Sequence, residues 1–279
     1  MNSFSSGLYI VSTPIGNLDD ITLRSIEVLK KSDFILCEDT RRTLKLLNHF
    51  NIKKKLISYH KFNETKELKN IIQHLKEGKI LSIVSDAGTP TLSDPGMILI
   101  NKCIESHIKI IPVPGPSSIT TSMSISGFED KFLFYGFLPK TKNELSKVLK
   151  SIKDLNYSLV FFVSGIKINF YLDFFKEFFL DRDILIAREI TKIHETFYRN
   201  SIKSIQPFKE SLKGELTIVI SKKYNNNNVT DEDIKKLSRK YLKKYSLKDA
   251  ADLVSKNKKV SRKRVYAICL EIKNDKKNF

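Results

Sequence analysis

The chain has 279 residues, a length that suits two domains better than one. Its 41% hydrophobic and 29% charged content is typical of a globular protein and excludes a disordered or fibrous one. The formal net charge of +18 favours polyanionic partners such as nucleic acid or acidic membrane surfaces. Because no apolar run is long enough for a membrane helix and the N-terminus lacks signal-peptide features, we expect no membrane association and a cytoplasmic location.

The basic charge has two readings. Lysine outnumbers arginine by 40 to 9, which compositional drift in an A+T-rich genome would also produce. Residues 222–279, however, hold 18 Lys and Arg against 7 Asp and Glu, more than drift alone should place at one end. Cys37, Cys103 and Cys269 are scattered, so we expect neither a disulfide framework nor a zinc site. His60 and His194 have no partner spacing that indicates a ligand set, and no metal is expected.

The first 125 residues alternate short apolar runs with helical patterns, which predicts an α/β domain with a mainly parallel sheet. Asp19 and Asp20 are expected to introduce its first helix, since acidic residues are favoured at a helix start. The expected strands are 8–12, 34–37, 80–84 and 109–113, and the expected helices are 21–30, 43–50, 64–77 and 96–105.

Residues 126–224 are expected to form a second α/β domain, and residues 225–279 a basic helical appendage. The appendage follows a low-complexity linker at 224–228. Its helices resemble a small nucleic-acid-binding unit, although a basic three-helix cap packed on its neighbour explains the spacing equally well. The expected strands of the second domain are 131–139, 158–163, 184–187 and 216–220, its expected helices are 142–153 and 169–179, and those of the appendage are 231–243, 247–256 and 261–273.

Three loops rich in Gly, Pro and hydroxyl residues follow predicted strands, at 12–18, 85–96 and 113–118. In an open α/β sheet, ligands bind at the edge where strands end. Glycine lets a backbone approach a ligand closely, and proline holds the loop still. Neither a G-x-x-x-x-G-K-[ST] nor a G-x-G-x-x-G pattern is present, so a nucleoside triphosphate or dinucleotide is disfavoured. The sequence therefore predicts a ligand site of another kind.

Several segments make the chain recognisable: residues 8–22, 37–42, 85–96, 114–117, 136–139 and 187–192. They closely resemble the ribosomal RNA methyltransferases of the tetrapyrrole (corrin/porphyrin) methylase superfamily, and the resemblance covers essentially the whole chain. It implies two α/β domains of the tetrapyrrole-methylase (class III methyltransferase) type with a cofactor cleft between them. It also implies S-adenosylmethionine as cofactor, and 2'-O-methylation of a cytidine ribose in the decoding region of small-subunit ribosomal RNA. The partner would be that RNA or the 30S subunit, and the relatives imply a homodimer.

The resemblance also implies which residues contact the cofactor. One departure stands out: Val163 occupies the position where relatives carry a Glu, so the role of that carboxylate is in doubt here. The implied cofactor contacts are Pro14, Gly16, Ser85, Asp86, Ala87, Gly88, Thr89, Ser117, Ser118, Val163, Ala187 and Glu215.

A 2'-hydroxyl is a poor nucleophile that gains from a nearby proton acceptor. Glu189, Lys192 and Asp86 are the candidate catalytic residues, and Glu38 and Asp39 are expected to face the same edge. A purely structural ion pair is an equally good explanation for each. Arginine pairs with phosphates in a planar, bidentate way. The candidate RNA-binding residues are Arg41, Arg42, Arg188, Lys192, Arg262 and Arg264.

Two other functions remain open. A small-molecule methyltransferase acting on a tetrapyrrole-like ring would use the same cleft, although it would hardly require the basic tail or the Thr-Arg-Arg stretch ending at Arg42. A non-enzymatic RNA-binding ribosome-assembly factor with a decayed cleft is the other alternative, and the departure at Val163 keeps it open.

Overall fold

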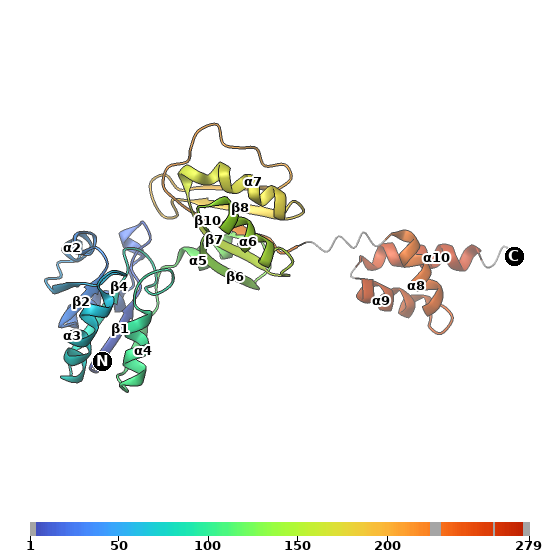
Figure 1. Ribbon diagram of the computed structural model, residues 1–279. Coiled ribbons are helices and arrows are strands. Elements are labelled where there is room, and N and C mark those ends of the chain that lie inside the picture. Colours follow the sequence, from blue (N-terminus) through green and yellow to red (C-terminus); the bar gives the residue numbers. More distant parts are fainter. Residues whose placement is uncertain (1–3, 224–229, 259, 276–279) are drawn as a thin grey trace. The chain divides into compact units, whose positions relative to one another are not determined.

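The computed structural model describes residues 4–223, 230–258 and 260–275 (Figure 1). The chain forms two compact units, residues 1–223 and 224–279. Over the described residues, the first unit contains two β-sheets with their helices, and the second contains three helices. None of the helices in the described ranges combines the length and the apolar character that crossing a membrane requires.

The first sheet is entirely parallel, as expected from the alternation of strands and helices, and its strand order is β3-β2-β4-β1-β5. Strands β1, β2 and β4 of this sheet are labelled in Figure 1. Its strands are β1 Gly7–Val11, β2 Phe34–Cys37, β3 Lys55–Ser58, β4 Ile80–Val84 and β5 Ile110–Val113. Strand β3 was not predicted, because it is an edge strand whose residues are exposed or half-buried and therefore lack the continuous apolar run of the central strands.

The helices of this sheet are α1 Leu23–Lys31, α2 Thr40–His49, α3 Glu64–Lys76 and α4 Met97–Glu105. One apolar cluster holds Val28, Leu29 and Leu47 of α1 and α2, and a second holds Ile71 and Leu99 of α3 and α4. The expected helix start at Asp19 and Asp20 is wrong. These residues lie in a separate 3₁₀ turn, Leu18–Asp20, and α1 is capped by Thr22, whose hydroxyl accepts a hydrogen bond from the Ser25 amide at 3.0 Å.

Helix α5, Ser118–Ser126, was not predicted, because its four serines obscure the apolar pattern. Ile119 and Met123 pack against Val160 and Leu185 of the second sheet. The helix begins directly after the loop that follows β5, so it links the edge of the first sheet to a face of the second. The domain boundary at residue 125 stays a prediction.

The second sheet is mixed, with strand order β6-β7-β10-β8-β9 and only the β6–β7 pair parallel. Helices α6 and α7 supply Leu145, Leu149 and Phe175 to the core on the face opposite α5. Strand β9, a half-exposed edge strand, was not predicted. The elements are β6 Phe132–Phe137, α6 Lys142–Ile152, β7 Ser158–Ser164, α7 Ile168–Phe178, β8 Asp183–Arg188, β9 Thr196–Ser201 and β10 Glu215–Ile220.

The second unit is a three-helix bundle, α8 Asp231–Tyr241, α9 Leu247–Lys258 and α10 Arg262–Asp275. Its core contains Ile234 of α8, Val254 of α9 and Val265 of α10, all fully buried. Thr230 and Asp233 form a reciprocal capping box at the start of α8, which fixes that end of the helix. The expected helical appendage is thus present.

Candidate functional site

Two of the predicted loops form one structure at the carboxyl edge of the first sheet. Thr13, after β1, and Gly88, after β4, exchange backbone hydrogen bonds of 2.9 and 3.0 Å. Gly88 has φ 80°, a conformation that favours glycine. The buried Ser85 hydroxyl is 3.2 Å from the carbonyl oxygens of both Ala87 and Gly88, which closes the turn. The backbone of this edge is therefore fixed without bulky side chains.

Carboxylates gather at the same edge, as expected for Glu38 and Asp39. The Asp39 amide donates to Asp86 at 3.2 Å, and Arg42 pairs with Asp86 at 3.3 Å. Burial, reinforced by Asp86, raises the pKa of Glu38. Burial together with Glu38 and Asp86 raises the pKa of Asp94, a residue that the sequence analysis did not single out, to about 6. This edge is consequently acidic.

Glu189, Lys192 and Glu215 form a cluster beside the second sheet. The Lys192 ammonium lies 3.0 Å from Glu189 Oε1 and 3.1 Å from Glu215 Oε2. The Glu215 amide also donates to Glu189 Oε1 at 2.9 Å, and a Cβ at Gly214 would lie 2.5 Å from that same oxygen. These contacts join the end of β8 and the turn that follows it to the start of β10.

The contacts within this cluster hold Glu189 and Lys192 in their charged forms. Burial by itself would raise the pKa of Glu189, but hydrogen bonds from the Glu215 amide and Lys192 outweigh it and lower the pKa. Burial would likewise lower the pKa of Lys192, but the two carboxylates outweigh it and raise the pKa. At neutral pH, Lys192 is therefore a cation and not a proton acceptor.

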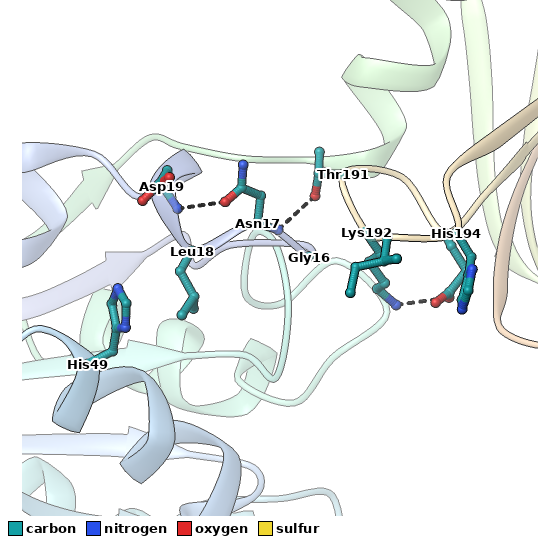
Figure 2. A pocket seen from close by; sticks show the side chains of 10 residues that line it. Gly16, Asn17, Leu18, Asp19, His49, Thr191, Lys192 and His194 are labelled. Atoms are coloured by element: carbon teal, nitrogen blue, oxygen red, sulfur yellow. Dashed lines mark hydrogen bonds and ion pairs between the residues drawn. The ribbon is translucent and has the colours of Figure 1, made fainter.

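Gly16 is where the loop after β1 meets the turn after β8. A Cβ at Gly16 would lie 2.5 Å from Lys192 Cγ, 2.6 Å from Thr191 Oγ1 and 2.8 Å from the Ile190 carbonyl oxygen. The neighbouring Asn17 amide donates to Thr191 Oγ1 at 3.0 Å, the contact drawn in Figure 2. The absence of a side chain at Gly16 is thus what allows the loops of the two sheets to touch.

Two hollows adjoin this contact and share Gly16, Leu18 and Lys192. The smaller has a volume of about 260 Å³ and is lined by Thr13, Pro14, Ile15, Gly16, Leu18, Arg42, Thr43, Lys45, Leu46, Ser85, Asp86, Ala87, Lys192 and Glu215. The larger has a volume of about 770 Å³ and is lined by Gly16, Asn17, Leu18, Asp19, His49, Glu189, Thr191, Lys192, Ile193 and His194 (Figure 2).

Half of the expected cofactor contacts line the smaller hollow, namely Pro14, Gly16, Ser85, Asp86, Ala87 and Glu215. Gly88 and Thr89 lie beside it, and the Thr89 hydroxyl is 3.4 Å from the Pro116 carbonyl oxygen, next to Ser117 and Ser118 at the start of α5.

Two of the expected contacts, Ala187 and Val163, are buried in apolar clusters. Ala187 is fully buried against Ile15 and Ile190, directly behind the loop of the first sheet. Val163 is buried in the other core of the second sheet, with Leu216 and the residues of α6 and α7. An aliphatic residue suits this position, so the chain's own packing explains the absence of a carboxylate at Val163.

The candidate RNA-binding arginines already have partners. Arg41 pairs with Asp39 at 2.7 Å, and Arg188 donates to the Lys213 carbonyl at 2.9 Å. In the second unit, Arg262 pairs with Asp252, and Arg264 with Asp231 at 2.7 Å, so both arginines connect helices of the bundle. Exposed ion pairs of this kind contribute about 0–1 kcal/mol, and phosphate binding would have to compete with each of them.

Within the described ranges, no three His, Cys, Asp or Glu residues gather in a way that could hold a metal ion. The site also contains residues that sequence reasoning missed: Asn17, Thr191, Ile193 and Asp94. Asn17, Asp94 and Thr191 lie inside the segments 8–22, 85–96 and 187–192, which carry the family resemblance. Nothing in their local pattern, however, indicates that they contact another element or become buried.

Comparison with known proteins identifies the family of the chain. A model of the family described as Tetrapyrrole (Corrin/Porphyrin) Methylases matches residues 7–206. A curated relative from Thermotoga maritima, "Ribosomal RNA small subunit methyltransferase I", is 47% identical over 219 residues, which cover 77% of this chain and 98% of that protein. The chain belongs to the tetrapyrrole methylase family, in its ribosomal RNA small subunit methyltransferase I group. A relative of the same name from Buchnera aphidicola is 40% identical over 277 residues, 95% of this chain and 97% of that protein.

Solved structures agree on the methylase fold. The methyltransferase CobJ superposes with a TM-score of 0.60 at 15% identity, covering 78% of this chain and 95% of that one. Uroporphyrin-III-C-methyltransferase from Thermus thermophilus gives a TM-score of 0.53 at 16% identity, covering 78% and 93%. At this identity the likeness concerns the fold alone, and it confirms the expected pair of α/β sheets.

Proposed function

We propose that this protein transfers a methyl group from S-adenosylmethionine to the 2'-hydroxyl of a cytidine in the decoding region of small-subunit ribosomal RNA. The main support is membership of the ribosomal RNA small subunit methyltransferase I group. The hollows that join the carboxyl edge of the first sheet to the Glu189–Lys192 turn are consistent with it.

The smaller hollow suits S-adenosylmethionine by its chemistry. Ala87 lines it with a small side chain, and Leu46 supplies an apolar surface. The carboxylates of Asp86 and Glu215 match the cationic groups of such a ligand. The bound cofactor supplies a methyl group already activated on a sulfonium sulfur, so the main tasks of the protein are positioning and desolvation.

We propose that Lys192 is a fixed cation between the two hollows and that its ammonium binds a phosphate or ribose oxygen of the RNA. Glu189 positions that ammonium and the Glu215 amide. Asp86, held by Arg42 and the Asp39 amide, lies on the cofactor side. The 2'-hydroxyl gives up its proton as the new C–O bond forms and the C–S bond breaks, a step that carboxylates at this edge assist.

The second unit is proposed to add RNA affinity. Because Arg262 and Arg264 are engaged within the bundle, the exposed Lys240, Lys243 and Lys244 near the carboxyl end of α8 are better phosphate ligands. These three lysines form no ion pair with any residue in the described ranges. The Thermotoga match, 219 residues long, is close in length to the first unit, so we regard the second unit as an accessory.

Labelled S-adenosylmethionine and purified small ribosomal subunits test the proposal directly, with the methylated nucleoside identified after digestion. Cofactor binding without transfer to RNA would favour a tetrapyrrole-like substrate, and no cofactor binding would favour an assembly factor. We further propose that the protein acts in the cytoplasm and forms a homodimer. Sedimentation at micromolar concentration tests the oligomeric state.

Removing residues 225–279 tests the second unit. We expect weaker RNA binding with a shallower dependence on salt concentration, because fewer phosphates are neutralised, while cofactor affinity stays unchanged. An equal loss of RNA and cofactor affinity would refute the assignment.

A further inference from the structure

Ile193 is the most exposed large apolar side chain of the described residues, at 98% of its full accessible surface. Single exposed hydrophobic residues are common on protein surfaces and need no explanation by themselves. Ile193, however, stands between Lys192 and His194 and lines the larger hollow. A side chain that lines a hollow and is nevertheless almost wholly exposed lies at its mouth.

The segment that presents Ile193 is held rigidly. Glu189 and Thr191 have φ of 49° and 64°, a region that non-glycine residues enter at a cost of about 1 kcal/mol or more each. The Thr191 amide donates to Glu195 at 2.7 Å, and the Glu195 amide donates to the Lys192 carbonyl at 3.0 Å. Strain of this size persists only where the surroundings enforce it, so the position of Ile193 is fixed and not incidental.

The larger hollow lies next to the proposed cofactor hollow, with Lys192 in the wall of both. Its volume of about 770 Å³ is ample for one nucleotide. Leu18 and the His49 ring on one side offer an apolar and an aromatic surface, and Lys192 on the other side, next to His194, offers a cation (Figure 2). Base faces stack on rings of this kind, and phosphates bind to cations.

A cytidine whose base and ribose both enter a hollow leaves its stacked neighbours, as bases do that are taken into enzyme pockets. Proteins that separate bases commonly insert an apolar wedge, often Ile, Leu, Phe or Met, in the place of the displaced base. We infer that the larger hollow receives the target nucleotide and that Ile193 is the wedge that replaces it in the RNA stack. This inference rests on the proposed function and adds the nucleotide subsite and a positioning residue.

Two variants test the wedge: Ile193→Ser removes it, and Ile193→Leu retains it. The matched control is Ile166→Ser, because Ile166 is also an exposed isoleucine, at 71%, but lines neither hollow. The substrates are small subunits reconstituted with normal RNA and with RNA carrying an abasic residue 3' to the target cytidine. The second substrate has already lost the stacking that the wedge must break.

On normal subunits we expect Ile193→Ser to lower kcat/KM roughly tenfold, comparable with the loss of one stacked base, and Ile193→Leu and Ile166→Ser to stay within about threefold of the parent. On the abasic substrate the defect of Ile193→Ser should shrink to less than about threefold, with cofactor affinity unchanged throughout. An unchanged rate of Ile193→Ser on normal subunits, or an equal loss on both substrates, would overturn the wedge. Failure of the parent protein to methylate either substrate would instead overturn the proposed function.

Discussion

Replacing Gly16 by alanine tests whether methyl transfer requires the two sheets to touch at this residue. The new methyl group would lie 2.5–2.8 Å from Lys192, Thr191 and the Ile190 carbonyl, of which the last is backbone and cannot rotate away. Because non-bonded carbon contacts are normally about 3.5 Å or longer, the loops must separate by roughly 0.5–1 Å.

Separation of the loops has two costs. Overpacking of a tight contact typically destabilises a protein by about 1–3 kcal/mol. Displacement of the Glu189–Lys192 turn by up to 1 Å also misplaces the groups that line both hollows, and misplacements of that size can reduce a rate about a hundredfold. We therefore expect a drop of about ten- to a hundredfold in kcat/KM, accompanied by a lengthened or lost Asn17–Thr191 hydrogen bond.

The assay combines methyl transfer from labelled S-adenosylmethionine with calorimetric cofactor binding and thermal unfolding. Gly78→Ala is the control, because a Cβ there meets nothing within 4 Å and the φ of 82° makes alanine strained. We expect this control to lose about 1 kcal/mol of stability and no activity. If Gly16→Ala keeps kcat/KM within twofold of the parent, the contact between the loops is not needed for transfer and the reasoning is wrong.

Two further predictions concern buried charges. Burial and the neighbouring Glu38 and Asp86 raise the pKa of Asp94 to about 6 in the folded protein, so its ionisation makes stability fall as pH rises from about 4 to about 6. Asp94→Asn should therefore be more stable than the parent by about 1 kcal/mol at pH 7, after allowance for solvent screening. In urea titrations this difference in unfolding free energy should vanish near pH 4. A difference that does not change with pH would contradict the prediction. Arg182 is 2% exposed and donates to the carbonyls of Lys153, Leu155, Tyr157 and Ser221. Arg182→Met should cost roughly 2–4 kcal/mol of unfolding free energy, because several buried carbonyls lose their donor; a loss below about 1 kcal/mol would show that they find other partners.

Local patterns were enough to predict most elements of this protein. All eight strands and helices that were predicted for the first sheet, among them β2 and α3, lie within a few residues of their expected positions, because short β-branched runs and 3.6-residue periodicity depend on neighbouring residues only. The elements that were missed are the edge strands β3 and β9 and the serine-rich α5. Their burial is partial or depends on distant residues, so their own sequence carries a weak signal.

The sequence by itself determined the parallel sheet, the loops at its carboxyl edge and the family to which the chain belongs. Only the tertiary structure decided that Gly16 meets the Ile190–Lys192 turn, that Lys192 is a fully paired cation and that Val163 faces a core. Asn17 and Thr191, for example, are 174 residues apart, and their hydrogen bond exists because the loop after β1 meets the turn after β8. Contacts at that separation depend on how whole elements pack, and no local pattern of residues encodes them.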